Sequence, residues 1–246
     1  MSTELLVLLT LTVATIAFLY SSVGHAGASG YIAVMTLFSL APAEIKPTAL
    51  ALNILVGSIA SWQFWRAGHF SWDLFWPFAL IAIPAAFFGG YLNLPTQAFK
   101  MLVGAVLLFS AARFLLQPPA EIEQPRAPAR PVALGVGAGL GLLAGLTGTG
   151  GGIFLTPLVI FMRWARTKTA SAISALFILC NSISGLLGNL SATKSFPGFA
   201  WPLALAAVVA GTLGAYLGSR RFPHTAIKRL LAIVLTIAGI KLIFTA

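Results

Sequence analysis

The amino-acid sequence predicts an all-α integral membrane protein, and three observations lead to this prediction. Hydrophobic residues make up 59% of the 246 residues and charged residues only 8%, whereas about 25% of the residues in an average soluble domain are charged. The mean hydropathy is +0.95. Apolar runs of about 20 residues, the helix length that crosses a bilayer, recur along the whole chain. A soluble chain with so few charges could not cover its core with polar surface.

We expect about eight full transmembrane helices and two short elements. The long apolar segments cover residues 5–23, 49–65, 74–92, 98–116, 132–149, 169–188, 199–218 and 225–245. Glu4 precedes the first of them, where a signal peptide would carry a positive charge, so we interpret this segment as a span. The short apolar pieces, 30–41 and 151–162, each follow a glycine-rich break and have too few residues to cross a bilayer. We expect both to be broken or re-entrant helices, which gives five elements in each half.

The two halves of the chain align with each other, which indicates a duplication. At an offset of 121 residues, Gly24, Gly27 and Gly30 fall on Gly145, Gly148 and Gly151, and the run TALA at Thr48 falls on TASA at Thr169. At an offset of 125, GGYL at Gly89 falls on GAYL at Gly214. A polar, proline-rich stretch separates the halves. We expect a first transmembrane repeat over residues 1–117, a cytoplasmic linker over 118–131 and a second repeat over 132–246.

The distribution of positive charge indicates that the repeats are inverted. If each short piece counts as a fifth crossing element, loops on one side carry 11 of the 15 Lys and Arg residues, and the other side keeps Lys46, Lys100, Lys194 and Lys241. If the broken first segment crosses only once, the split weakens to 9 against 6. Positive residues favour the cytoplasmic side. We therefore expect a multi-pass protein of the bacterial inner membrane with both termini on the periplasmic side.

The run GLTGTGGGIFLTP, residues 145–157, places glycines and threonines at the expected depth of a bilayer. Unwound backbone is tolerated there only where protein or a watery cavity satisfies it. In duplicated transporters such breaks meet near the midplane, where half-helix N-termini offer free N–H groups to an anion. We therefore predict a substrate site at both breaks. The predicted residues are Ser22, Gly24, His25, Gly27, Ser29 and Gly30 in the first break, and Thr147, Gly148, Thr149, Gly150, Gly151 and Gly152 in the second.

Two asparagines complete the predicted site. Asn53 and Asn181 lie in the helices that follow the short pieces, where their amides can bind a ligand or bond across helices. His25 is equally open to a ligand role or to a hydrogen bond with a backbone carbonyl. For any single glycine, close helix packing is the alternative interpretation.

The few acidic residues favour an anionic or neutral substrate. Glu4, Glu44, Asp73, Glu121 and Glu123 all lie near segment ends or in loops, whereas cation pumps place carboxylates inside the membrane. The single cysteine, Cys180, excludes a disulfide framework. We expect no metal and no cofactor. The expected partners are a small anion and the lipid bilayer, with apolar surfaces that permit a homodimer. The +10 charge fits membrane orientation better than nucleic acid.

The motifs resemble those of a known transporter family. GHAGASG at Gly24 and GLTGTGGGIFLTPL at Gly145 are each followed by a short apolar run and then by a helix that begins TALALN or TASAIS. With these motifs the sequence resembles the TauE/SafE sulfite exporter family over nearly the whole chain, although His25, Ala28 and Ser29 stand where more glycine is usual. The resemblance implies export of sulfite or an organosulfonate across the bacterial inner membrane without ATP hydrolysis. No Walker motif is visible, and alternating access would rock one repeat against the other.

Three other functions stay open at this point. An anion channel also uses glycine backbone, although duplicated halves with broken helices favour a carrier. The run GASG at Gly27 matches the pattern of rhomboid-type intramembrane proteases, with Ser29 as nucleophile and His25 or His224 as its base. The duplication has no role in that chemistry, so we do not expect an enzyme. A scaffold without a substrate is the third alternative.

Overall fold

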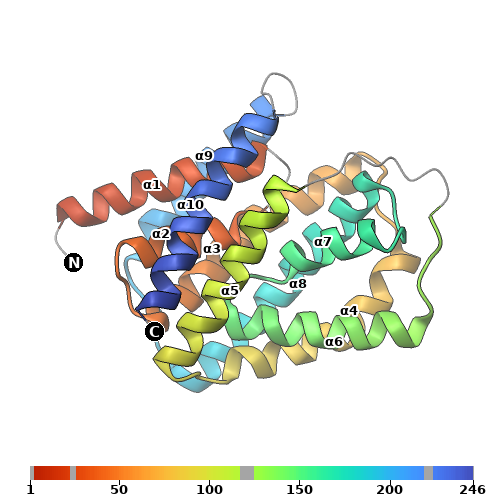
Figure 1. The fold of residues 1–246 in the computed structure, drawn as a ribbon, viewed down its shortest axis with the longest axis horizontal. Helices are drawn as coiled ribbons and strands as arrows, with labels where there is room; N and C mark the ends of the chain where they lie inside the picture. Colours follow the sequence, from red (N-terminus) through yellow and green to blue (C-terminus); the bar gives the residue numbers. More distant parts are fainter. Residues whose placement is uncertain (1–2, 23–25, 117–124, 219–223, 246) are drawn as a thin grey trace.

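The computed structural model describes residues 3–22, 26–116, 125–218 and 224–245, and these ranges contain helices and loops but no strand. Ten helices follow one another along the chain (Figure 1): α1 Thr3–Ser22, α2 Ala28–Leu37, α3 Pro42–Arg66, α4 Trp72–Tyr91, α5 Thr96–Leu115, α6 Arg130–Thr147, α7 Gly152–Phe161, α8 Thr167–Thr193, α9 Ala200–Gly218 and α10 His224–Phe244. The expected all-α fold is confirmed.

Within the described ranges, five helices are long and apolar enough to cross a bilayer. These are α1, α3, α4, α6 and α8. The short helices α2 and α7, with 10 residues each, lie where the sequence predicts broken elements. Helices α5, α9 and α10 lie at the other predicted segments. The number of eight full spans therefore stays a prediction.

Helix α3 begins earlier than the apolar pattern indicates. The sequence predicts a start at residue 49, whereas the helix begins at Pro42, a residue well suited to the first turn because its missing N–H would have no partner there. The Glu44 carboxylate accepts a hydrogen bond from the Ala41 N–H at 3.1 Å. This longer start places Lys46 inside a helix instead of a loop.

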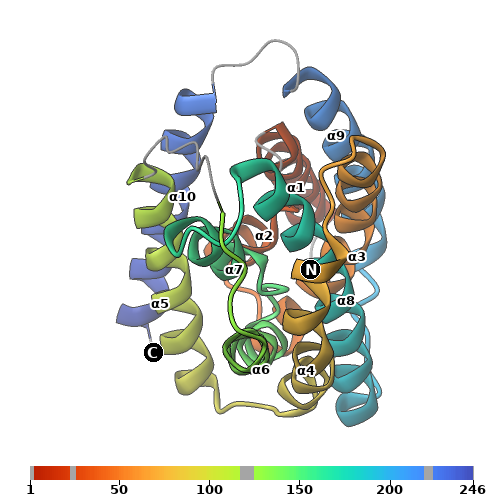
Figure 2. The same ribbon diagram turned by 90° about the vertical axis from the view of Figure 1, so that its right-hand side faces the viewer.

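The two halves of the chain interleave. Helix α1 packs along α9, and α6 packs along α4, while α5 pairs with α10 and α3 with α8. Each pair joins a helix from the first half to a helix from the second. Figure 2 shows the short helices α2 and α7 in the middle of the molecule, with α5 and α10 on one side and α3, α4, α8 and α9 on the other. The repeats thus do not form separate bodies, and their limits and inversion stay predictions.

Glycines allow α4 and α6 to touch at the level of the backbone. Gly137, Gly141 and Gly145 recur at every fourth position of α6, and a Cβ on each would meet the carbonyl oxygen of Phe78, Ala82 and Ala86 of α4, respectively. The same is true of Gly90 in α4 and the carbonyl of Gly185 in α8. The Ser184 hydroxyl donates to the Ile83 carbonyl across the same contact. Close helix packing is therefore the role of these glycines, as in other membrane helices.

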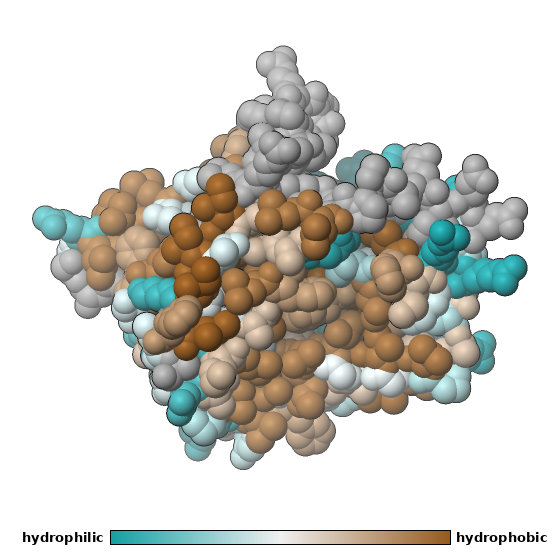
Figure 3. Space-filling model, viewed as in Figure 1, coloured by the Kyte–Doolittle hydropathy of each residue, from teal (hydrophilic) through white to brown (hydrophobic). Residues whose placement is uncertain are grey.

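The buried apolar residues form two clusters. One draws mainly on α1, α2, α3, α5, α9 and α10, and the other on α4, α6, α7 and α8. Ile178 of α8 is a member of the first cluster, so α8 lies where the two clusters meet. Figure 3 shows that apolar side chains also cover most of one outer face, with hydrophilic residues near its margins. Such an outer surface suits contact with lipid tails.

Candidate functional site

The second glycine break separates α6 from α7. Helix α6 ends at Thr147 and α7 begins at Gly152, and Gly148, Gly150 and Gly151 have φ angles of 80°, 72° and 78°. A side chain is disfavoured in this left-handed region, which explains the glycines. In the described part of the chain, no backbone carbonyl accepts a hydrogen bond from the N–H groups of residues 150–152. Because the break is buried, it presents these N–H groups inside the protein.

Helices α3 and α8 place polar side chains against this break. The Asn53 amide Nδ2 lies 3.4 Å from the Gly148 carbonyl oxygen, a long and weak hydrogen bond. A Cβ on Gly150 would lie 2.8 Å from the Ser182 Oγ and 3.2 Å from the Asn53 Nδ2. Backbone and side-chain donors from three segments therefore converge on Gly150.

Several polar atoms of this region are buried without a partner. The Asn53 Oδ1, both amide atoms of Asn181 and the Ser182 Oγ have no hydrogen bond with any residue the structure describes. Asn53, Asn181 and Ser182 are each 0% exposed. Most buried polar groups in proteins are hydrogen-bonded to protein, water or a ligand. These atoms are thus available to a polar ligand.

The threonines of the break are bonded within it. The hydroxyls of Thr147 and Thr149 lie 2.9 Å apart, and the Thr147 hydroxyl donates to the Leu143 carbonyl at 2.7 Å. These hydrogen bonds stabilise the shape of the break. Because the threonine hydroxyls are already bonded, they have fewer free hydrogen-bonding positions for a ligand than the asparagine amides. Gly151 and Gly152 pack tightly, since a Cβ on them would meet the side chains of Phe177 and Ile178 respectively.

The first break differs from the second. Gly27, with a φ of 96°, precedes α2, and a Cβ on Gly30 would meet the side chains of Ile16 and Tyr20 in α1, so Gly30 serves helix packing. The Ser29 hydroxyl lies 2.8 Å from the Tyr20 hydroxyl. Gly24 and His25 lie outside the described residues, as does the side chain of Ser22. Among the described residues that flank the first break, Tyr20 and Ser29 form a buried hydroxyl pair.

The Tyr20–Ser29 contact bears on the protease alternative. Ser29 is 1% exposed, and its described partner is a phenol, which is not a base near neutral pH. Activation of a serine nucleophile needs an adjacent base. The described surroundings of Ser29 therefore fit a structural hydrogen bond.

We predict that Tyr20→Phe lowers the free energy of unfolding by about 1–3 kcal/mol, because it leaves the buried Ser29 hydroxyl without a partner. The double variant Tyr20→Phe with Ser29→Ala should recover part of this loss, since both polar groups are then removed. Thermal unfolding of the purified variants measures both effects. A Tyr20→Phe variant as stable as the wild type would contradict this reading.

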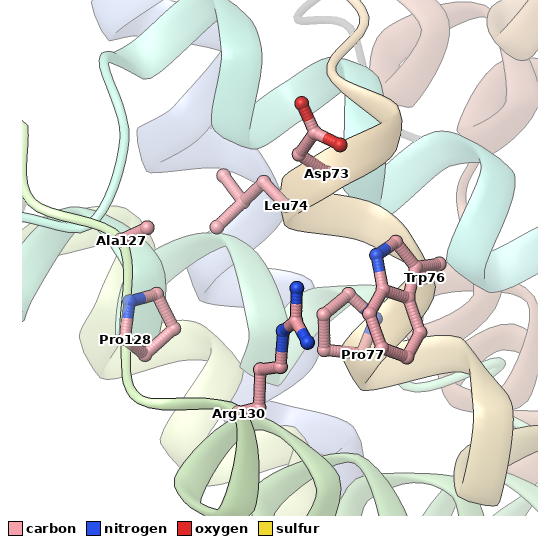
Figure 4. Close-up of a pocket in the computed structure, with 7 residues that line it drawn as sticks. All are labelled: Asp73, Leu74, Trp76, Pro77, Ala127, Pro128 and Arg130. Atoms are coloured by element: carbon pink, nitrogen blue, oxygen red, sulfur yellow. The ribbon is translucent and has the colours of Figure 1, made fainter.

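A pocket of about 180 Å³ lies at the start of α4, at the end of that helix opposite Gly89 and Gly90. It is lined by Asp73, Leu74, Trp76, Pro77, Ala127, Pro128 and Arg130 (Figure 4). The Arg130 guanidinium lies 5.4 Å from the centre of the Trp76 ring, a cation–π contact. The pocket joins the segment before α6 to α4 and includes none of the predicted site residues.

The sequence pattern missed two residues near the second break. Ser182 lies next to the predicted Asn181 on α8 and faces Gly150. The sequence predicts Lys46 in a loop, but the residue lies in α3 and its backbone carbonyl oxygen lies 3.2 Å from the position of a Cβ on Gly148. A serine in an apolar helix gives no local signal, whereas a longer prediction for α3 would have found the buried lysine.

Comparison with known proteins gives two matches. The family model described as Sulfite exporter TauE/SafE matches residues 9–242. The chain is 39% identical over 235 residues to a Sinorhizobium fredii protein named Probable membrane transporter protein y4hK, and the match covers 93% of this chain and 94% of that protein. No solved structure matches the chain.

Proposed function

Because the chain belongs to the TauE/SafE sulfite exporter family, a family of membrane transporters, we propose that it is a secondary transporter that exports sulfite or an organosulfonate across the bacterial inner membrane. The observation that carries this proposal is the buried break at residues 148–152, where Gly150 lies beside the amide of Asn53 and the hydroxyl of Ser182. The N–H groups of residues 150–152 have no described backbone acceptor. We assign the substrate to this break.

The chemistry of the break suits an oxyanion. Successive backbone N–H groups in left-handed and turn conformations form a concave anion site, and the N-terminus of α7 adds the positive end of a helix dipole. Amide and hydroxyl donors from α3 and α8 can bind further oxygens. The described acids do not oppose an anion, because Glu4, Glu44 and Asp73 lie in the first turns of α1, α3 and α4, where helix dipoles stabilise them.

Transport proceeds by alternating access in this proposal. The two halves are inverted repeats with a cytoplasmic linker and periplasmic termini, as the distribution of positive charge favours. The inside-negative membrane potential then drives the exit of an anion. An anion channel would use the same backbone donors, and saturation of the flux together with counterflow distinguishes a carrier from it.

A thermal-shift panel on the purified full-length protein tests the substrate class. Sulfite or a sulfonate at about 100 times its Kd should stabilise the folded state by about 2.7 kcal/mol, which raises Tm by several degrees. Carboxylates of similar size should give a smaller shift. A panel in which no sulfur oxyanion shifts Tm would contradict the proposed function.

Asn53→Leu provides the site-specific arm of this experiment. The substitution keeps a similar volume but removes the amide, so we expect the sulfite-induced shift to disappear. Asn189→Leu is the matched control, because Asn189 is also buried and its Oδ1 also lacks a described partner, while the adjacent Gly188 packs against Phe87 and Tyr91 of α4. A full shift in Asn53→Leu, or an equal loss in both variants, would remove Asn53 from the site.

A further inference from the structure

Lys46 is a buried lysine near the start of α3. It is 5% exposed and is the one charged side chain among the buried polar residues of the described chain. Its Nζ donates to the carbonyl oxygens of Gly89, Gly90 and Leu92 at 3.1, 2.8 and 2.9 Å. The ammonium therefore has three hydrogen bonds at the C-terminus of α4.

The same residue touches the second glycine break with its backbone and stem. A Cβ on Gly148 would lie 3.2 Å from the Lys46 carbonyl oxygen, 3.4 Å from its Cα and 3.6 Å from its Cγ. Gly148 in turn accepts the hydrogen bond from Asn53. The backbone and stem of Lys46 thus lie next to the break to which we assign the substrate, while its ammonium group lies at the C-terminus of α4.

The charge of Lys46 has no described counter-ion. All three described acceptors of its Nζ are backbone carbonyls. The carbonyls carry partial charges but no net charge. A buried ionised group without a partner of opposite charge is costly in a membrane protein, and such groups usually have a function.

We propose that Lys46 supplies the fixed positive charge of the anion site, and that it acts on the substrate through its electric field without touching it. This inference rests on the proposed function, because it assigns the compensating negative charge to the transported anion. The N–H and amide groups then orient the oxyanion, while the positive charge of Lys46 strengthens the binding of the oxyanion according to its net charge. A field effect of this kind grows in proportion to the charge of the ligand.

A purely structural role makes a different prediction. If Lys46 only caps the last turn of α4, its replacement would weaken all ligands equally, through the stability or the shape of the fold. Two unit charges about 12 Å apart change an affinity by about tenfold at an effective dielectric constant of about 20. Under the field model, the loss is then about tenfold for a monoanion and about a hundredfold for a dianion.

The experiment measures the Kd of methanesulfonate, a monoanion, and of sulfite at a pH at which it is the dianion, on purified full-length protein. Lys46→Gln removes the charge but keeps an N–H donor for the α4 carbonyls, and Lys46→Arg keeps both. Lys241→Gln is the matched control, since the Lys241 Nζ donates in the same way to the carbonyls of Thr36 and Leu37 at 3.0 and 2.9 Å, at the end of α2.

We expect Lys46→Gln to raise the Kd of sulfite by about the square of the factor by which it raises the Kd of methanesulfonate. Lys46→Arg and Lys241→Gln should bind both anions with Kd values close to those of the wild type. Equal losses for both anions, no loss in Lys46→Gln, or the same loss in Lys241→Gln would overturn the role of Lys46 and leave the proposed function standing. If only one anion binds the wild type, the role of Lys46 is overturned when Lys46→Gln weakens the binding of that anion and Lys46→Arg weakens it as well. If neither anion binds the wild type, both proposals fail.

Discussion

Gly150→Ala is expected to reduce anion binding and transport by at least about a hundredfold, as displacement of a positioning group by about 1 Å does in other sites. The residue has a φ of 72°, and an added Cβ would lie 2.8 Å from the Ile178 Cγ2 and the Ser182 Oγ and 3.2 Å from the Asn53 Nδ2. The methyl group would therefore occupy the space between the break and the two helices that supply the other donors. Transport into or out of proteoliposomes measures the effect.

Gly139→Ala is the control for this substitution. Gly139 lies within α6, and apart from the neighbouring backbone of α6 itself no described atom lies within 4 Å of the position of its Cβ. Alanine has a helix propensity about 1 kcal/mol better than glycine, so this variant should transport normally and be at least as stable as the wild type. A folded Gly150→Ala variant with normal flux would show that the substrate does not use this part of the break.

Gly141→Leu is expected to cause the largest loss of stability, about 3 kcal/mol or more, because the α4–α6 contact has no room for a side chain. A Cβ at this position would meet the carbonyl oxygen and backbone carbon atoms of Ala82. The two helices would have to move apart along the contact that Gly137 and Gly145 continue. Thermal unfolding and the monodisperse yield of the purified protein measure this loss.

Gly135→Leu tests whether the effect belongs to the contact. Gly135 lies on the same helix and is exposed, and apart from the neighbouring backbone of α6 no described atom lies within 4 Å of its Cβ position. We expect little change in Tm for this variant. A Gly141→Leu protein as stable as Gly135→Leu would contradict the backbone-level packing of α4 and α6.

Most of the helices could be predicted from the sequence because the signal is strong and repeated. The apolar runs and the break at residues 148–152 give α6 and α7 nearly at their observed bounds. The start of α3 was missed because the residues before Thr48 include Lys46 and two prolines, which lower the local hydropathy. The interleaving of the halves was not predicted, because a pattern along the chain does not state which helices pack together.

The candidate site was predicted only in part. The two glycine-rich breaks are visible in the sequence because they align at one offset, and the matched residues Gly27 and Gly148 both have a positive φ. Asn53 stands out as a polar residue in an apolar helix. Ser182 and Lys46 join the break through contacts between distant segments, for which the sequence gives no local signal. Gly30 packs against α1, so a matched glycine position in the sequence does not by itself distinguish a ligand contact from helix packing.

Anomalous diffraction from crystals soaked with selenite, the selenium analogue of sulfite, tests the central proposal most directly. Our account predicts a selenium peak beside residues 150–152, with its oxygens within hydrogen-bond distance of the backbone N–H groups and of Asn53 or Ser182. A peak found only elsewhere, such as between Asp73 and Arg130, or no peak at a selenite concentration that shifts Tm, would contradict it.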